Sequence, residues 1–202
     1  MLTSIALLTS LVLSDAAGAS ATVKEISARL KPFSTLHATF VEERRVEGLT
    51  KPLKSTGRLV YARNKGLLWL VEKPLASQTV MTSTSLVQTI KGRVTVKLDV
   101  AAQPSMQVIS RLFVASLTGD WAPLEADFEM NAHQTPSSWT LRLTPKGGLF
   151  AKFARSLEVT GDTSVHSVEL AELSGDSSTT QFATPLFDVP LTADEEARLG
   201  AK

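Results

Sequence analysis

The segment that follows the first 21 residues has the hydrophobic period of a helix. Its apolar positions are Val23, Ile26, Leu30 and Phe33. This spacing predicts a short amphipathic helix that ends near Pro32. The segment 22–25 reads Thr-Val-Lys-Glu and matches a capping box, so we expect the helix to begin at Thr22.

From Leu36 onward the period changes to two, which is typical of strands. One face of the first strand consists of Leu36, Ala38 and Phe40, and one face of the second consists of Gly57, Leu59, Tyr61 and Arg63. The apolar run from Leu67 to Val71, centred on Trp69, indicates a strand covered on both faces. Further short strands are expected at 77–82, 86–91, 93–100, 126–133, 138–144, 156–160, 165–173 and 179–183.

A second helical period interrupts the strands after Pro104. Its apolar face consists of Met106, Ile109, Leu112, Phe113, Ser116 and Leu117. Gly119 is the expected stop, and 120–124 is a candidate for one further helical turn. The segment 192–199 fits either a terminal helical turn or a tail.

These elements predict a mainly β (α+β) domain with about ten short antiparallel strands. A sheet of this extent tends to curl, and one that does not close must cover its concave face. The two amphipathic helices are the available cover, so we expect an incomplete β-barrel, a half-barrel. Either the helices fill an ordinary core, or they form a lid over a hydrophobic cavity.

The first 21 residues differ from the rest of the chain. An apolar stretch over 2–13 is followed by Ala19-Ser20-Ala21, a small-x-small cleavage site. This pattern predicts a secretory signal peptide over 1–21, cleaved after Ala21 or alternatively after Ala19. The mature domain would then be 22–202, free in the compartment that it enters.

Composition and charge exclude several classes of function. The chain of 202 residues has no cysteine and a net charge of +1, which argues against disulfides, Cys-ligated metals and nucleic-acid binding. The three histidines, at positions 37, 133 and 166, form no metal-ligand motif, and no nucleophile or phosphate-loop motif is present. Glu42 and Glu43 adjoin Arg44 and Arg45, which we interpret as a solvated face whose charges compensate each other. We therefore expect no catalysis, no metal and no cofactor.

The strand segments carry a resemblance to a known superfamily. The relevant residues, in order, are Phe40-Val41-Glu42-Glu43-Arg44, Pro52-Leu53-Lys54-Ser55-Thr56-Gly57, Leu59-Val60-Tyr61, Leu67-Leu68-Trp69, Lys73-Pro74, the helix 109–120 and Leu141-Arg142-Leu143-Thr144-Pro145. Their succession resembles the LolA outer-membrane lipoprotein carrier superfamily. The Pro-Leu-x-Ser-x-Gly segment is most similar to a LolA-like branch, some members of which accompany aryl polyene or other lipid-biosynthesis genes.

The resemblance implies a soluble, monomeric periplasmic carrier. It would shield the acyl chains of a lipoprotein or lipid, take this cargo from an inner-membrane releasing machine and deliver it to an outer-membrane acceptor. The acceptor of such a pathway has an acylated cysteine, so a chain without cysteine fits the shuttle. Two alternatives remain: a hydrophobic-ligand sensing module, and an enzyme or accessory factor of lipid or aryl polyene biosynthesis.

The resemblance also implies roles for individual residues. Arg63 matches an arginine that is linked to lid closure, and its guanidinium is suited to bonding carbonyls reversibly. The candidate cavity residues are Phe40, Leu59, Tyr61, Trp69, Met81, Val96, Ile109, Leu112, Phe113, Trp139 and Leu141. Each of them could equally be plain core, because the pattern does not say which strand face points inward.

Overall fold

The computed structural model describes residues 15–100 and 102–200. In this range the elements are α1 (Asp15–Arg29), β1 (Thr35–Arg45), β2 (Leu53–Ala62), β3 (Gly66–Lys73), β4 (Ser77–Met81), β5 (Ser85–Ile90), β6 (Arg93–Asp99), α2 (Pro104–Thr118), a 3-10 turn η1 (Ala122–Leu124), β7 (Phe128–Gln134), β8 (Trp139–Pro145), a 3-10 turn η2 (Phe150–Lys152), β9 (Ala154–Gly161), β10 (Val165–Glu172), β11 (Ser177–Phe187) and α3 (Ala193–Gly200).

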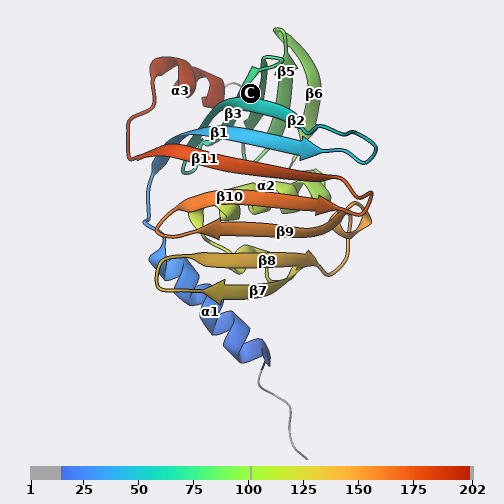
Figure 1. Cartoon of the computed structure of the whole chain (residues 1–202). Coiled ribbons are helices and arrows are strands. Elements are labelled where there is room, and N and C mark those ends of the chain that lie inside the picture. The colour runs from blue at the N-terminus through green and yellow to red at the C-terminus, as the bar shows by residue number, and fades with distance from the viewer. Residues whose placement is uncertain (1–14, 101, 201–202) are drawn as a thin grey trace, which may run out of the picture.

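The strands form one antiparallel sheet that stays open. Its order is β6-β5-β4-β3-β2-β1-β11-β10-β9-β8-β7, so the N-terminal and C-terminal groups of strands meet where β1 pairs with β11. The sheet curls, and α2 lies along its concave side (Figure 1). The predicted mainly β half-barrel is therefore confirmed.

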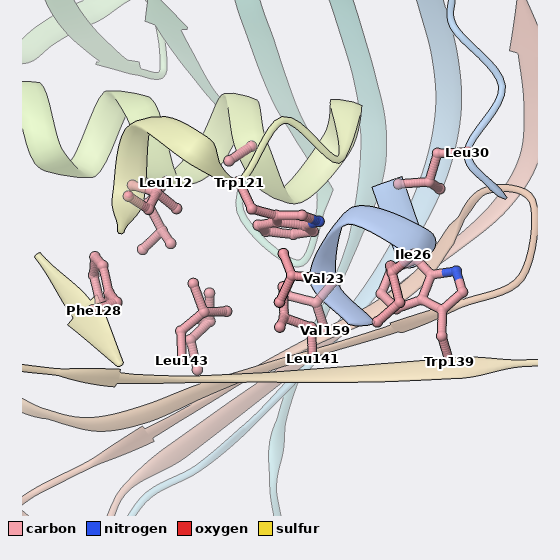
Figure 2. Close-up of a cluster of buried hydrophobic side chains, with 13 residues drawn as sticks. Val23, Ile26, Leu30, Leu112, Trp121, Phe128, Trp139, Leu141, Leu143 and Val159 are labelled. Carbon is pink, nitrogen blue, oxygen red and sulfur yellow. The ribbon is translucent and has the colours of Figure 1, made fainter. Parts of the chain in front are cut away.

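Two apolar clusters lie on the concave side, one at each half of the sheet. The first joins α1, α2 and η1 to β7–β9, and Figure 2 shows Trp121, Ile26 and Val23 above Leu141 and Val159. The second gathers residues of β1–β4 around Phe40, Leu59 and Tyr61, together with Leu117 of α2. Helix α2 therefore contributes to both clusters and spans the gap between them.

A third cluster lies on the outer face of the sheet. Leu68 and Leu70 of β3 pack there with Val60, Val80 and Leu199. The apolar run of β3 is thus covered on both faces, as predicted, and its outer cover is α3. Of the two alternatives for 192–199, the structure shows the helix.

Helix α1 begins earlier than expected. We predicted a start at Thr22, which is wrong for this chain, because the helix already runs from Asp15. The residues 16–22 are mostly alanine and other small residues, and alanine has the highest helix propensity, so nothing in them stops the helix. Of the predicted signal peptide 1–21, residues 1–14 lie outside the described part of the chain.

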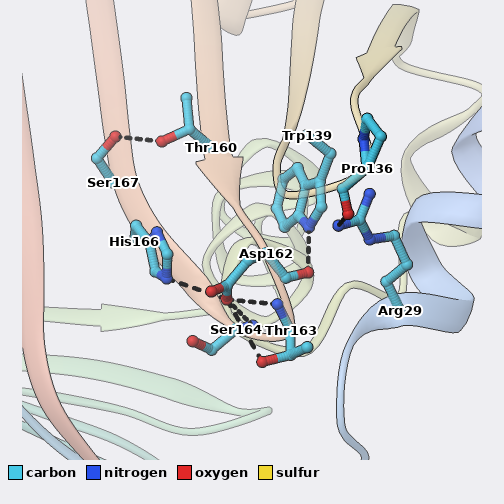
Figure 3. Close-up of polar contacts among 9 residues, drawn as sticks. All are labelled: Arg29, Pro136, Trp139, Thr160, Asp162, Thr163, Ser164, His166 and Ser167. Atoms are coloured by element: carbon cyan, nitrogen blue, oxygen red, sulfur yellow. Dashed lines mark hydrogen bonds and ion pairs between the residues drawn. The ribbon is translucent and has the colours of Figure 1, made fainter.

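Helix α1 is fixed to the open edge of the sheet by Arg29. Its guanidinium donates to the carbonyl oxygen of Thr135 at 2.7 Å, in the turn between β7 and β8. It also donates to the carbonyl oxygen of Pro136 at 3.1 Å (Figure 3). The turn between β9 and β10 is ordered by Asp162, which accepts from the backbone N–H of Ser164 at 3.0 Å and contacts the His166 ring at 3.0 Å (Figure 3). Arg29 thus ties α1 to the β7–β8 turn, and Asp162 orders the turn between β9 and β10.

Candidate functional site

A cavity of about 490 Å³ lies between α2 and the concave face of the sheet. Its lining is mostly apolar and comes from eight strands, η2 and one face of α2. The lining residues are Glu42, Leu67, Trp69, Val71, Ser77, Thr79, Met81, Leu86, Gln88, Val96, Ile109, Leu112, Phe113, Ser116, Leu117, Phe150, Leu157, Val168, Leu170, Ser178, Thr180 and Phe182. A volume of this size falls in the range of roughly 300–1,000 Å³ found for small-molecule sites.

One wall of the cavity is aromatic and is centred on Trp69. Its ring stacks on Phe40 with the centroids 4.1 Å apart and meets Phe182 edge-on at 6.2 Å. Phe113 of α2 reaches across to the same ring at 6.3 Å and is itself 39% exposed. The wall therefore links the sheet directly to the helix that covers it.

Gly57 makes the stacked pair possible. It lies opposite Phe40 on β1 and Val71 on β3. A Cβ at this position would lie 2.8 Å from Cζ of Phe40 and 2.0 Å from the carbonyl oxygen of Leu70. The absence of a side chain at Gly57 thus lets the Phe40 ring lie flat against β2 beneath Trp69.

The roof of the cavity is one face of α2, which is anchored at its C-terminal end. Gly119 ends the helix with φ 72°, and its N–H donates to the carbonyl of Ala115 at 2.8 Å. Ser27 of α1 donates to the Gly119 carbonyl oxygen at 2.7 Å, and Leu30 fills the space beside the glycine. The predicted stop at Gly119 and the apolar face of this helix match the structure.

The predicted cavity residues divide into two groups. Trp69, Met81, Val96, Ile109, Leu112 and Phe113 line the cavity. The other five are buried in the two flanking clusters, and they are Phe40, Leu59, Tyr61, Trp139 and Leu141. Phe40 still shapes the site, since it supports Trp69 from beneath.

Arg63 follows the end of β2 and does not lie within the strand. The strand ends at Ala62, and Asn64 adopts φ 65° in the turn that follows, so the prediction that Arg63 shares a strand face with Leu59 and Tyr61 is wrong. Its Nη2 donates to the carbonyl oxygen of Phe33 at 2.7 Å, in the linker between α1 and β1. Burial raises the pKa of the neighbouring Tyr61, which the positive charge of Arg63 partly opposes.

The charged residues at the end of β1 are arranged differently from our interpretation. Arg44 does not compensate the adjacent glutamates but pairs with Glu172 at 3.0 Å and Asp176 at 3.2 Å. Glu43 points to the outer face, where its pair with Lys54 lowers the pKa of the carboxyl. Because neighbouring strand residues point to opposite faces, Glu42 is left on the concave face and lines the cavity.

Sequence reasoning missed Glu42, and several other polar residues, as part of the cavity lining. Ser77, Thr79 and Gln88 come from β4 and β5, while Ser178 and Thr180 come from β11. The signal was present in the alternation, since Glu42 is two residues beyond the inward-facing Phe40. Among the described residues, no helix is long and apolar enough to cross a membrane, and no group of three or more potential metal ligands is found.

Together, the half-barrel, the helical cover and the apolar cavity define a domain built to enclose a hydrophobic ligand. A model of the family described as outer membrane lipoprotein carrier protein LolA-like matches residues 15–198, and the chain belongs to this family. No curated protein matches the sequence significantly.

Solved structures show the same fold at low sequence identity. A domain from Vibrio parahaemolyticus assigned as an outer-membrane lipoprotein-sorting protein is 11% identical, with a TM-score of 0.50 and coverage of 89% of this chain and 96% of that one. A protein of the DUF1329 family from Desulfovibrio piger is 10% identical, with a TM-score of 0.50 and coverage of 91% and 97%. A LolA superfamily protein from Nitrosomonas europaea is also similar, at 10% identity, a TM-score of 0.44 and coverage of 87% and 98%.

Proposed function

We propose that the protein is a periplasmic carrier that encloses acyl chains of a lipid or lipoprotein and delivers them toward the outer membrane. The observation that carries this proposal is the mostly apolar cavity of about 490 Å³ roofed by α2. Burying an acyl chain is worth about 0.8 kcal/mol per methylene, so a twelve-carbon chain gains roughly 10 kcal/mol gross. A lipid therefore needs such a shelter to cross an aqueous compartment.

Membership of a family named for lipoprotein carriers supports transport over catalysis. Delivery also requires release, and a helix that roofs the cavity without closing it suits both steps. The proposal includes a leader that is removed near Ala21, an inner-membrane loading partner and an outer-membrane acceptor. A sensing module would bind the same ligands but would not transfer them.

The first test is extraction of the purified protein with organic solvent and mass spectrometry of the extract. A carrier expressed in its own compartment should yield an acylated species at close to one molecule per chain. Transfer of that species from loaded protein to acceptor vesicles then separates carriage from simple binding. Binding without transfer would support the sensing alternative, and turnover of the lipid would support an enzyme or accessory factor.

The second test blocks the cavity. Thr79 faces the cavity from the middle of the β3–β5 strands, so Thr79→Phe should reduce the affinity for a fluorescent acyl probe by at least about tenfold, the equivalent of two buried methylenes. Thr144→Phe is the matched control, because Thr144 is exposed on β8 and lies outside the cavity lining. Equal affinity of the two variants would contradict the assignment of this cavity as the acyl site.

Arg63 is proposed to couple the α1–β1 linker to the lid. Its bond to the Phe33 carbonyl holds a residue that packs on Tyr61 and Phe187, next to Leu117 of α2. Arg63→Leu should therefore slow ligand release or weaken retention, as measured by stopped-flow transfer to vesicles. Arg58→Leu is the control, since the exposed Arg58 pairs with Glu72 away from the cavity, and identical transfer rates in both variants would remove this role.

A further inference from the structure

The cavity has a polar region built around one carboxylate. Glu42 lies on the inward face of β1, directly opposite Ser55 of β2 and Thr180 of β11. Ser55 donates its hydroxyl to Glu42 Oε2 at 3.4 Å. The remaining polar lining consists of neutral hydroxyl and amide side chains from Ser77, Thr79, Gln88, Ser116, Ser178 and Thr180.

The charge of this region is of one sign only. Among the described residues that line the cavity, Glu42 is the only one of a charged type, and none is lysine, arginine or histidine. The nearest basic position on the same strand face is Arg44. Its guanidinium is bound by Glu172 at 3.0 Å and Asp176 at 3.2 Å, so its charge is already matched by two carboxylates.

This arrangement favours one kind of ligand head group. A carboxylate only accepts hydrogen bonds, and bonds from an ammonium or hydroxyl group to a charged acceptor are stronger than neutral ones. A negatively charged head group would face Glu42 in surroundings of lowered dielectric, with no cation in the lining to offset the repulsion. The apolar part of the cavity would accept the acyl chains of either kind of amphiphile, so the polar region decides between them.

We propose that the cavity selects acyl amphiphiles whose polar end donates hydrogen bonds and carries no negative charge, with Glu42 as the acceptor. A glyceryl hydroxyl and a primary amine are the simplest groups of this class. The inference deepens the proposed carrier function and rests on it, because it names the chemistry of the head group that accompanies the acyl chain.

The test compares three probes that share a twelve-carbon chain and differ only at the polar end. These are 1-lauroylglycerol, dodecylammonium and laurate, each below its micelle concentration and measured by displacement of a fluorescent apolar probe. The neutral and cationic probes should bind the wild-type protein at least about tenfold more tightly than laurate, as expected for one charge-assisted hydrogen bond gained or lost.

Glu42→Gln keeps the side-chain shape and removes the charge. It should therefore reduce the difference in affinity between laurate and the other two probes to within about threefold. Glu43→Gln is the matched control. It removes the same charge from the adjacent residue, which pairs with Lys54 on the outer face. It should leave the difference in affinity between the probes unchanged. Thermal unfolding of both variants checks that they remain folded. The comparison of the three probes on the wild-type protein tests the selection without any variant.

The outcomes distinguish a failure of this inference alone from a failure of the proposed carrier function. Head-group selection by Glu42 is refuted if all three probes bind the wild-type protein equally, or if Glu42→Gln leaves the difference in affinity between laurate and the other probes unchanged. The carrier function stands in both cases. If none of the three probes binds, both fall together.

Discussion

Gly57 is the position at which a single methyl group should disturb both the fold and the cavity wall. In Gly57→Ala the new Cβ would lie 2.0 Å from the carbonyl oxygen of Leu70 and 2.8 Å from Cζ of Phe40. The first contact is with backbone and cannot be relieved by a change of rotamer. The strand pair β2–β3 must therefore separate locally, and the Phe40 ring must leave its stack on Trp69.

The cost follows from these two displacements. Overpacking a well-filled site typically costs about 1–3 kcal/mol, and the upper value applies where backbone must move. The stack of Phe40 on Trp69 contributes about 0.5–1.5 kcal/mol beyond burial. We therefore expect Gly57→Ala to lower the free energy of unfolding by about 3 kcal/mol, which shifts the urea midpoint by roughly 1 M.

Urea unfolding followed by far-UV circular dichroism measures this loss, and near-UV circular dichroism reports the Phe40–Trp69 stack. Gly147→Ala is the control, because no atom lies within 4 Å of a Cβ built there, and it should stay within about 0.5 kcal/mol of wild type. The reasoning is refuted if Gly57→Ala also stays within that limit with an unchanged near-UV spectrum.

Two further predictions concern the helices at the margins of the sheet. Burial raises the pKa of Glu195, but bonds from the Thr192 N–H and from His37 outweigh it and lower the pKa overall. The ionised Glu195 carboxylate therefore stabilises the fold at pH values above the usual glutamate pKa, and this contribution is lost as the pH falls through the lower pKa of the folded state. Glu195→Gln should therefore lower the free energy of unfolding at pH 7, and the difference from wild type should shrink as the pH falls below the usual glutamate pKa. Arg29→Ala removes the hydrogen bonds to the Thr135 and Pro136 carbonyls. Amide hydrogen exchange in the β7–β8 turn should therefore accelerate, while the exchange rates in β2 and β3 stay unchanged.

The strand pattern was predictable because half-buried strands alternate. On β1 the even positions from Leu36 to Phe40 are buried, and the odd positions are not. The end of the second helix was predictable for a similarly local reason, since Gly119 adopts the left-handed conformation that glycine favours. Features decided by one residue and its immediate neighbours were therefore accessible from the sequence.

The division between cavity and core was not accessible. Tyr61 and Trp69 share the inward face of neighbouring strands, yet Tyr61 is buried in a cluster and Trp69 borders open space. Both positions demand an apolar side chain, so alternation cannot distinguish them. What distinguishes them is the path of α2, which depends on long-range contacts such as that between Ser27 and Gly119.

The terminal helix could have been identified from its first turn. Thr192 and Glu195 form a reciprocal capping box, in which the Thr192 N–H donates to Glu195 Oε2 at 2.8 Å and the Glu195 N–H donates to Thr192 Oγ1 at 3.3 Å. The same four-residue pattern at Thr22 led us to predict a helix start there, although α1 begins before it, at Asp15. The contact of Glu195 with His37 of β1, at 3.3 Å, could not be identified in this way, because it depends on the tertiary fold.

The outer cluster explains how the sheet can leave part of its concave face unfilled. Leu68 and Leu70 of β3 are buried against α3 on one side, while Trp69 and Val71 of the same strand border the cavity on the other. Apolar burial is roughly proportional to area wherever it occurs, so packing on the outer face stabilises β2–β4 independently of what lies inside. The inner face of these strands can therefore border a cavity, because packing on their outer face already contributes to their stability.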